Sequence, residues 1–283
     1  MSLLRTLLVL GRVSNLPTLW SNCLAGWWLG GAGHPEQLPF LFAGASFLYA
    51  GGMFLNDAFD AEFDQRHRPE RPIPAGLISL TIVWQWGLIG LGLGGACLIC
   101  LGRVTGGLGV ALVFCILLYD SIHKRIAWAP VLMGLCRLLV YLIAASVGVQ
   151  GVTGWSVWCG LALASYVAGL SYLARRESTP GPLGYMPALL LPVPIGLALI
   201  MNAAGYRQAA LLLSAALALW VVRALRQTLR FAEPNVGRTV SRLLAGIVLV
   251  DWLAVADAPR QLGFVFIALF LAALLLQRIV PAT

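Results

Sequence analysis

Residues 38–64 read LPFLFAGASFLYAGGMFLNDAFDAEFD, and this stretch decides the fold. From 38 to 55 it contains no charged residue, and the acids begin only at Asp57. An α-helix needs about 20 apolar residues to cross the hydrocarbon core of a bilayer. We therefore predict a membrane-spanning helix over 38–57 that ends in a cluster of acidic side chains.

The composition of the whole chain agrees with a membrane protein. Of its 283 residues, 60% are hydrophobic and 11% are charged, whereas soluble domains have roughly 45–50% apolar and about 25% charged residues. So many apolar residues exceed what one soluble core can bury, and they require a surface that faces lipid. No polar linker interrupts the chain, so we predict a single membrane domain over residues 1–283.

Similar apolar stretches recur from one end of the chain to the other. The ten candidate spans are 14–31, 38–57, 79–102, 104–122, 128–149, 152–174, 185–203, 206–225, 239–257 and 262–280. If all ten cross, both termini lie on the same side; if one late segment is a half-helix or lies in the interface, nine cross. The predicted fold is an all-α, polytopic membrane bundle of nine or ten transmembrane helices.

The distribution of lysine and arginine gives the bundle an orientation. The ends predicted to share one side carry fifteen basic residues: Arg5, Arg12, Arg66, Arg68, Arg71, Lys124, Arg125, Arg175, Arg176, Arg223, Arg226, Arg230, Arg238, Arg242 and Arg278. The opposite ends carry Arg103, Arg207 and Arg260. Cytoplasmic loops are the ones enriched in basic residues, so we expect an integral membrane protein, of the bacterial inner (plasma) membrane, with the acidic cluster facing the cytoplasm. Basic residues that punctuate apolar segments argue against nucleic-acid binding, despite the net charge of +8.

The acidic segment carries the chemistry. Asn56, Asp60 and Asp64 recur every four residues, which places them on one face of a helix, with Asp57 within reach. Like charges stacked on one face at a membrane boundary repel each other and lose solvation. A divalent cation removes this conflict, and Mg²⁺ prefers such oxygen ligands together with substrate phosphates. We predict that Asn56, Asp57, Asp60 and Asp64 hold Mg²⁺, and that phosphate oxygens complete its coordination.

Basic residues on the same side are candidates for binding the phosphate. Arg66 and Arg71 follow the acids directly, and Lys124 ends the fourth span. Arginine forks and lysine point charges both bind phosphate, although the same residues also serve as ordinary cytoplasmic anchors. His123, next to Lys124, is interpreted as an interfacial residue rather than as a catalyst.

Other polar residues near the predicted site have less specific patterns. Asn15 lies near the beginning of the first span, on the side of the bundle that carries the acidic segment. Tyr119 and Tyr172 lie beside charged residues. Arg137 and Asp251 fall well within spans, where charge is costly, so they either form a functional site or pair with each other.

These motifs resemble the UbiA superfamily of intramembrane prenyltransferases. Its first signature is similar to Asn56-Asp57-x-x-Asp60-x-x-x-Asp64 followed by Arg66 and by residues 71–76, RPIPAG. Arg12-x-x-Asn15 and Tyr119-x-x-x-x-Lys124 also look like that family. The resemblance implies a helical bundle around a central cavity, Mg²⁺ on an isoprenyl diphosphate, and capture of the resulting carbocation by an acceptor. It assigns catalysis to Asp60, Asp64 and Lys124, and diphosphate binding to Arg66, Arg71 and Lys124.

The chain departs from that pattern after the sixth span. The family's second motif is Asp-x-x-x-Asp, but residues 171–177 read SYLARRE, with Glu177 as the sole acid. In this respect the chain is similar to the divergent UbiA-like branch of Ebo-type biosynthetic clusters. A guanidinium can replace part of a metal's charge, so we expect Arg175 and Arg176 to contact the diphosphate. The other residues that we expect to contact substrate are Glu177, Tyr172, Asn15, Tyr119 and Arg137.

The resemblance and the residues lead to one favoured reaction and two alternatives. We expect Mg²⁺-dependent transfer of a prenyl group from an isoprenyl diphosphate to a small aromatic or lipophilic acceptor within the membrane. One alternative is a terpene cyclase on the same fold. The other is a protein that binds or transports a lipid diphosphate without cleaving it.

Overall fold

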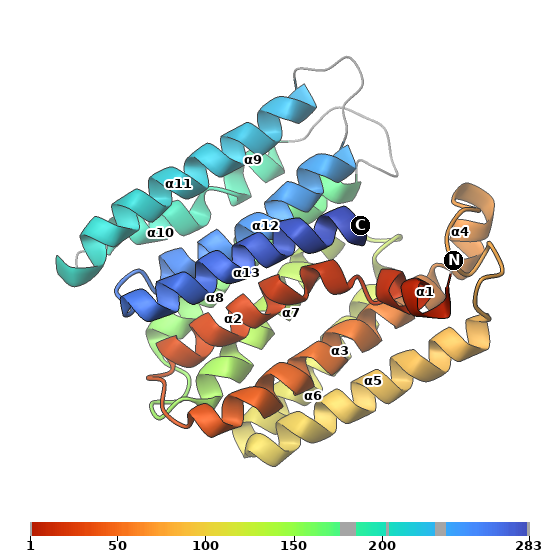
Figure 1. Ribbon diagram of the computed structural model, residues 1–283, viewed down its shortest axis with the longest axis horizontal. Helices are drawn as coiled ribbons and strands as arrows, with labels where there is room; N and C mark the ends of the chain where they lie inside the picture. The colour runs from red at the N-terminus through yellow and green to blue at the C-terminus, as the bar shows by residue number, and fades with distance from the viewer. Residues whose placement is uncertain (1, 176–184, 202–203, 230–235, 282–283) are drawn as a thin grey trace.

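The computed structural model describes residues 2–175, 185–201, 204–229 and 236–281. Within these ranges the chain contains helices and no strands, so the prediction of an all-α fold is confirmed. The α-helices are α1 Leu3–Leu10, α2 Leu16–Leu29, α3 Leu38–Phe59, α4 Ala61–His67, α5 Leu80–Leu101, α6 Arg103–Ile122, α7 Ala129–Val147, α8 Gly154–Ala174, α9 Met186–Leu190, α10 Val193–Ile200, α11 Ala204–Leu229, α12 Val236–Ala254 and α13 Arg260–Ile279. Figure 1 shows the long helices running alongside one another in a single bundle.

The membrane character follows from the helices, but the count of nine or ten spans is not confirmed. Among the described residues, seven helices are long and apolar enough to cross a bilayer, by length and composition. α2 has only 14 residues, and α12 includes Arg238, Arg242 and Asp251. Because these two helices are short or charged, they fall outside the seven although each coincides with a predicted span.

The predicted span over 185–203 is wrong as a single helix. The described part of this stretch consists of α9 and α10, with Leu191 and Pro192 between them. Proline has no amide hydrogen, and its ring clashes with the preceding turn of a helix. Pro192 and Pro194 therefore divide an apolar stretch that hydropathy alone treats as continuous.

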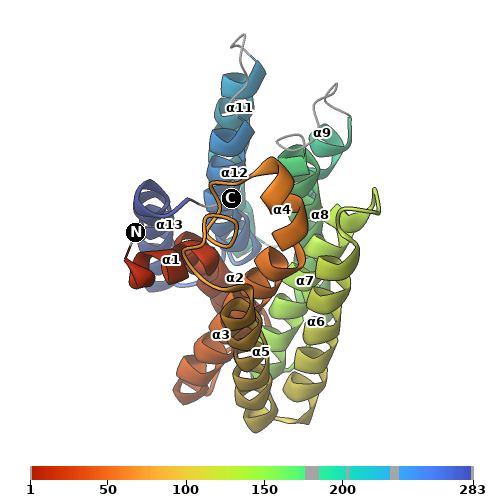
Figure 2. The same cartoon turned by 90° about the vertical axis from the view of Figure 1, so that its right-hand side faces the viewer.

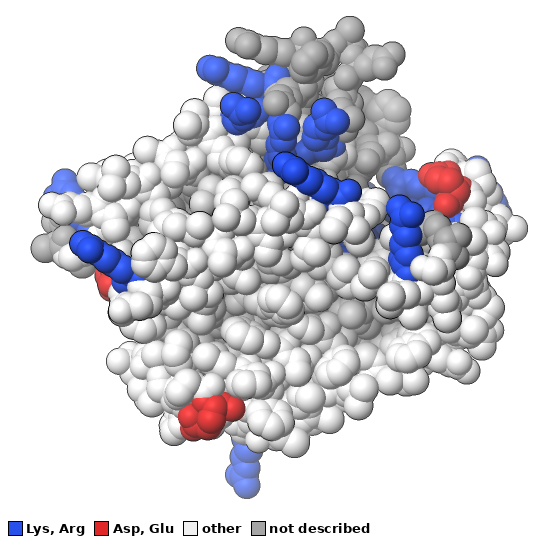
Figure 3. All heavy atoms as spheres, viewed as in Figure 1, with Lys and Arg blue, Asp and Glu red and all other residues white. Residues whose placement is uncertain are grey.

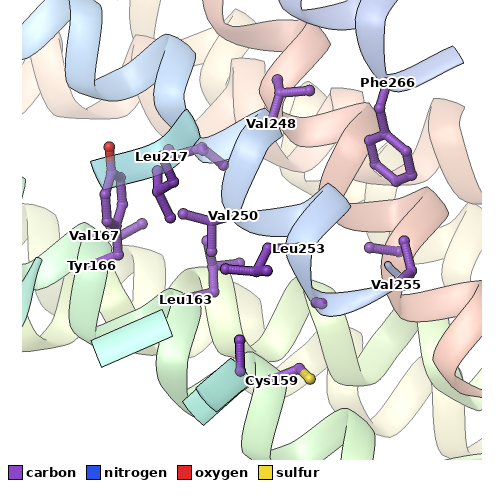
Figure 4. Packing of buried hydrophobic residues seen from close by; sticks show 14 of the residues in the cluster. Cys159, Leu163, Tyr166, Val167, Leu217, Val248, Val250, Leu253, Val255 and Phe266 are labelled. Carbon is purple, nitrogen blue, oxygen red and sulfur yellow. The ribbon is translucent and has the colours of Figure 1, made fainter. Parts of the chain in front are cut away.

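The described residues form two large hydrophobic cores, to both of which α2 and α7 contribute, and a small third cluster of Leu10, Ala58, Ile78 and Val83. One core lies among α2, α3, α5, α6 and α7. The other joins α2, α7 and α8 to the C-terminal helices, where Leu163, Leu217 and Val248 are completely buried; Figure 4 shows its packing. A small apolar hollow in this second core is lined by Cys159, Ala162, Pro194, Leu197, Ala198, Tyr206, Val250, Leu253 and Ala254. None of these residues belongs to the acidic segment, so the central cavity that the resemblance implies stays a prediction.

Glycines allow α3 and α5 to pack closely. A Cβ atom on Gly90 would lie 2.9 Å from the Cα of Gly51, and one on Gly94 would lie 2.8 Å from the carbonyl oxygen of Gly44. Small residues of this kind let membrane helices approach until their backbones touch. This contact fixes the position of the end of α3, where the acids lie.

The two ends of the bundle differ in charge. Both chain termini lie at the same end (Figure 1), and Ser14 Oγ donates to the carbonyl oxygen of Pro281 at 3.4 Å. α4 projects beyond the end of α3 in the view of Figure 2. In Figure 3 the basic side chains gather near this end, whereas the middle of the visible face is almost free of charge. Large apolar side chains such as Phe114 on α6 and Leu212 on α11 are exposed, as a lipid-facing surface requires.

Candidate active site

The acidic segment lies where α3 ends and α4 begins. α3 ends at Phe59 and α4 begins at Ala61, so Asp60 is the boundary residue. The amide of Asp60 still donates to the carbonyl of Asn56 at 3.0 Å, and that of Asp64 donates to the carbonyl of Asp60 at 2.8 Å. The four-residue register therefore continues through the boundary, and Asn56, Asp60 and Asp64 lie one turn apart, as their spacing predicts.

Arg12 reaches the acids from the turn between α1 and α2. Its backbone is in the left-handed region, at φ 42° and ψ 47°, which a residue with a side chain rarely adopts. Its guanidinium Nη2 lies 3.4 Å from Asn56 Oδ1 and 3.3 Å from Asp57 Oδ1. The hydroxyl of Tyr49 donates to the Arg12 carbonyl at 3.4 Å. Strained backbone is held in place by its surroundings and is typical of functional sites.

Arg71 bridges two acids from the turn that follows α4. Its Nη1 lies 2.9 Å from Asp57 Oδ1 and 3.4 Å from Asp64 Oδ2. Asp57 therefore meets two guanidinium groups, those of Arg12 and Arg71. Of the two arginines expected to bind diphosphate in this loop, Arg71 is the one that lies in the cluster. Arg66 instead pairs with Glu62 at 2.6 Å, and both side chains are exposed.

Lys124 and His123 approach the same acids from the end of α6. Lys124 Nζ lies 2.9 Å from Asp60 Oδ1, and His123 Nε2 lies 3.4 Å from the same oxygen. The ammonium also lies 3.5 Å from the ring centroid of Phe63, a cation–π contact. The ammonium group of Lys124 therefore links the end of α6 to Asp60 and to Phe63 of α4.

Burial and charge act in opposite directions on these carboxyl groups. Burial favours the neutral form of Asp60, but hydrogen bonds and charges from His123 and Lys124 outweigh it and hold the pKa of Asp60 below its ordinary value. Burial raises the pKa of Asp64, and the nearby Asp60 carboxylate adds to this effect against the opposing charge of Arg71. Basic side chains of the chain itself therefore carry much of the neutralisation that the sequence led us to assign to a divalent cation.

The remaining oxygen atoms fit a magnesium ion that shares its coordination with phosphate. Asp64 is 2% exposed, and its Oδ1 atom is buried without a hydrogen-bond partner. In the described ranges no three histidine, cysteine or acidic side chains converge as a complete metal site. Mg²⁺ is usually held by one or two carboxylates, with water and substrate phosphate supplying the other ligands, so an incomplete set of oxygen donors suits it.

The structure describes several other residues that the sequence predicts to bind substrate. Asn15 is 4% exposed at the start of α2. Tyr119 stacks on His123 with ring centroids 5.0 Å apart, and Tyr172 lies half-buried on α8. Arg175 Nη1 donates to the backbone carbonyls of Ile126 and Ala127 at 2.9 and 2.8 Å. Two further predicted residues, Arg176 and Glu177, lie outside the described residues.

Arg137 and Asp251 belong to a buried polar network that Asn22 connects. Arg137 Nη1 donates to Asn22 Oδ1 at 2.6 Å, and Asn22 Nδ2 donates to Asp251 Oδ2 at 2.7 Å. Ser21 and Tyr141 also donate to Asp251, at 2.5 and 3.0 Å. An amide therefore bridges the two charges and ties α2 to α7 and α12. The guanidinium carbon of Arg137 also lies 5.9 Å from the ring centroid of Tyr49, on the side of the acidic helix.

The sequence interpretation missed two members of the cluster, Asp120 and His123. Asn56 Nδ2 donates to Asp120 Oδ1 at 3.0 Å, and His123, interpreted from the sequence as an interfacial residue, lies 3.4 Å from Asp60 Oδ1. The available signal was the order of residues 119–125, YDSIHKR, in which Asp120 precedes Lys124 by one helical turn.

Comparisons with known proteins agree with this fold. The chain is 36% identical over 83 residues to the digeranylgeranylglyceryl phosphate synthase of Sulfolobus acidocaldarius, a match that spans 29% of this chain and 29% of that relative. The apo structure of a UbiA homologue from Aeropyrum pernix K1 aligns with a TM-score of 0.65 at 17% identity, covering 88% of this chain and 98% of that one. A UbiA homologue from Archaeoglobus fulgidus bound to GPP and Mg²⁺ aligns with a TM-score of 0.53 at 14% identity, covering 95% and 98%.

The match to a family covers most of the chain. Residues 14–235 match the UbiA prenyltransferase family, from the start of the first predicted span to the beginning of α12. This range includes the acidic segment, Arg71 and Lys124. The protein is therefore a membrane protein that belongs to the UbiA prenyltransferase family.

Proposed function

We propose that residues 1–283 form a single catalytic domain that transfers a prenyl group from an isoprenyl diphosphate to a lipophilic or aromatic acceptor within the membrane. One observation carries this proposal. Asp57, Asp60 and Asp64 are buried at the end of an apolar bundle, where they form ion pairs with the more exposed side chains of Arg71 and Lys124. A site with both acids and bases suits a ligand that brings its own metal and its own negative charge.

The named relatives support this substrate class. Homologues are described as digeranylgeranylglyceryl phosphate synthases, and solved neighbours as bound to GPP or DMAPP with Mg²⁺. We infer that this chain binds an isoprenyl diphosphate in the same way. The exposed side chains around the bundle are apolar, as in a surface that faces lipid. A molecule that reaches the site through the bilayer has to be lipophilic, so we infer a lipophilic acceptor.

Asn56, Asp60 and Asp64 would hold Mg²⁺, with Asp57 orienting Arg12 and Arg71 beside them. When bound, the ion supplies positive charge that stabilises the leaving diphosphate. Arg71 and Lys124 are the cationic side chains of the cluster that would bind phosphate oxygens directly. The apolar helices would hold the prenyl tail and keep water away from the prenyl carbon that loses the diphosphate.

We place the protein in the bacterial plasma membrane with the active site facing the cytoplasm. The basis is the unequal distribution of basic residues, fifteen on the side of the acidic segment against three on the other. Labelling of single cysteines by an impermeant maleimide in intact cells tests this orientation. We expect a cysteine at Arg103 to react and one at Arg125 to stay protected, and the reverse result would contradict the orientation.

The decisive experiment measures pyrophosphate release and products from purified protein in nanodiscs. The assay supplies a panel of isoprenyl diphosphates and a lipid extract as the source of acceptor. We expect release that depends on Mg²⁺ and is lost in Asp60→Ala, while Asp257→Ala, an exposed acid in the turn before α13, retains it. Prenylated products would support the proposal. A cyclised hydrocarbon would indicate a terpene cyclase, and binding without release would indicate a carrier of lipid diphosphates.

A further inference from the structure

Asp120 is a buried acid that the proposed reaction does not yet use. It lies on α6 and is 5% exposed. Its Oδ1 atom accepts a hydrogen bond from Asn56 Nδ2 at 3.0 Å, although the two residues are 64 positions apart. The packing of α6 against α3 thus brings an additional carboxylate to the first residue of the acidic segment.

Asp120 differs from the other acids of the cluster in its charge balance. Each of the others has a basic partner within 3.4 Å: Asp57 meets Arg12 and Arg71, Asp60 meets Lys124, and Asp64 meets Arg71. Within the described ranges Asp120 has no ion pair, and its Oδ2 atom is buried without a hydrogen-bond partner. Among the described residues its side chain is hydrogen-bonded to the neutral amide of Asn56, and the charges of Arg12 and His123 act on it without an ion pair.

A buried carboxyl group in this state is stabilised by a cation or by a proton. Burying charge is costly unless the group is paired or coordinates a metal. The side-chain amide of Asn56 donates to Asp120 through Nδ2, while its Oδ1 atom accepts a hydrogen bond from Arg12 at 3.4 Å. Asp120 Oδ2 and Asn56 Oδ1 are therefore oxygen atoms of adjoining side chains, both of the kind that Mg²⁺ prefers.

We propose that Asp120 is a further ligand of the Mg²⁺ in this site, supplied by α6 rather than by the acidic segment. The inference rests on the proposed function, because the ion is the one that accompanies the isoprenyl diphosphate. It assigns the two oxygen atoms of Asp120 different roles. Oδ1 orients the Asn56 amide, and Oδ2 coordinates the ion.

Replacing Asp120 by asparagine separates these two roles. Asparagine keeps an Oδ1 atom that accepts the hydrogen bond from Asn56, but it removes the negative charge. Binding of Mn²⁺, a paramagnetic substitute for Mg²⁺, is measured by electron paramagnetic resonance on the full chain in nanodiscs. The titration is run with MnCl₂ alone and with MnCl₂ plus geranyl S-thiolodiphosphate, an unreactive analogue.

We expect Asp120→Asn to raise the Mn²⁺ dissociation constant at least about tenfold, as the loss of groups around a metal typically does. Asp120→Glu, which retains a carboxylate, should recover part of this loss, and Asp257→Asn should match the wild type. Asp120→Ser provides the same removal of charge if the asparagine variant does not fold. Melting temperatures without metal identify the folded variants.

The outcomes distinguish this inference from the proposed function. If Asp60→Asn and Asp64→Asn weaken Mn²⁺ binding but Asp120→Asn leaves it unchanged, Asp120 only orients Asn56 and the inference is overturned while the proposed function stands. If the wild type binds no Mn²⁺ even with the analogue, both are overturned. Losses in Asp120→Asn and Asp120→Ser alongside those in Asp60→Asn and Asp64→Asn, with recovery in Asp120→Glu, support a coordinating carboxylate.

Discussion

Lys124 Nζ lies 2.9 Å from Asp60 Oδ1. The ammonium group just after α6 therefore neutralises the carboxylate of Asp60, the residue between α3 and α4. The lysine side chain remains 32% exposed, which leaves it accessible to an incoming anion. This pair joins two segments that are distant in sequence. It also gives the cluster a cation whose partner can change from carboxylate to phosphate.

The first prediction concerns this lysine. Lys124→Met should lower kcat for prenyl transfer by about 10²-fold, the scale of losing one preorganised charge-stabilising group. Lys124→Arg should lose less, because the charge remains although its geometry changes. Arg125→Met removes an exposed neighbouring charge and is the control. Equal losses in Lys124→Met and Arg125→Met would show that only the overall charge of the surface matters.

The second prediction concerns the geometry of Arg71. Its guanidinium contacts Asp57 and Asp64 together, which the single ammonium of a lysine reproduces poorly. Arg71→Lys should raise KM for geranyl diphosphate about tenfold, in keeping with the strength of charge-assisted hydrogen bonds. Arg66→Lys, in an exposed pair with Glu62, should leave KM unchanged. Steady-state kinetics check both, and an unaltered KM in Arg71→Lys contradicts a role in binding.

The third prediction concerns the glycine contact between α3 and α5. A Cβ atom on Gly90 would lie 2.9 Å from the Cα of Gly51, whereas one on Gly92, on the same helix, meets nothing within 4 Å. Gly90→Ala should destabilise the protein by about 1–3 kcal/mol through overpacking. Gly92→Ala should be neutral or stabilising by up to about 1 kcal/mol, because alanine favours helix more than glycine does. Thermal unfolding in detergent compares them, and equal melting temperatures would rule out the close contact.

The fourth prediction concerns the amide that links Arg137 and Asp251. Asn22→Leu conserves much of the side-chain volume but removes both hydrogen bonds. Leaving buried polar groups without these partners should cost about 1–3 kcal/mol of stability. Gln208→Leu, at an exposed amide on α11, is the control. Unfolding followed by circular dichroism measures the difference, and a fully stable Asn22→Leu protein would mean that the network contributes little.

Some features of this protein follow from the sequence because they depend on local order. Hydropathy located most of the long helices that the structure describes, and the four-residue spacing placed Asn56, Asp60 and Asp64 on successive turns. Both signals are periodic and short-range, so they hold whatever the rest of the chain does. Hydropathy failed over 185–203, because an average over a window of apolar residues does not register that a proline ends a helix.

The partners of those residues were decided only by the tertiary structure. Nothing in the order of the chain states that Arg12 and Lys124 both meet this segment, that Asp120 reaches Asn56, or that Asn22 stands between Arg137 and Asp251. Hydrogen bonds and ion pairs act over a few ångströms, and the packing of α2, α3, α6, α7 and α12 determines which groups come that close. The sequence by itself therefore determined where charge and apolar surface lie along each helix, and helix packing decided which charges neutralise one another.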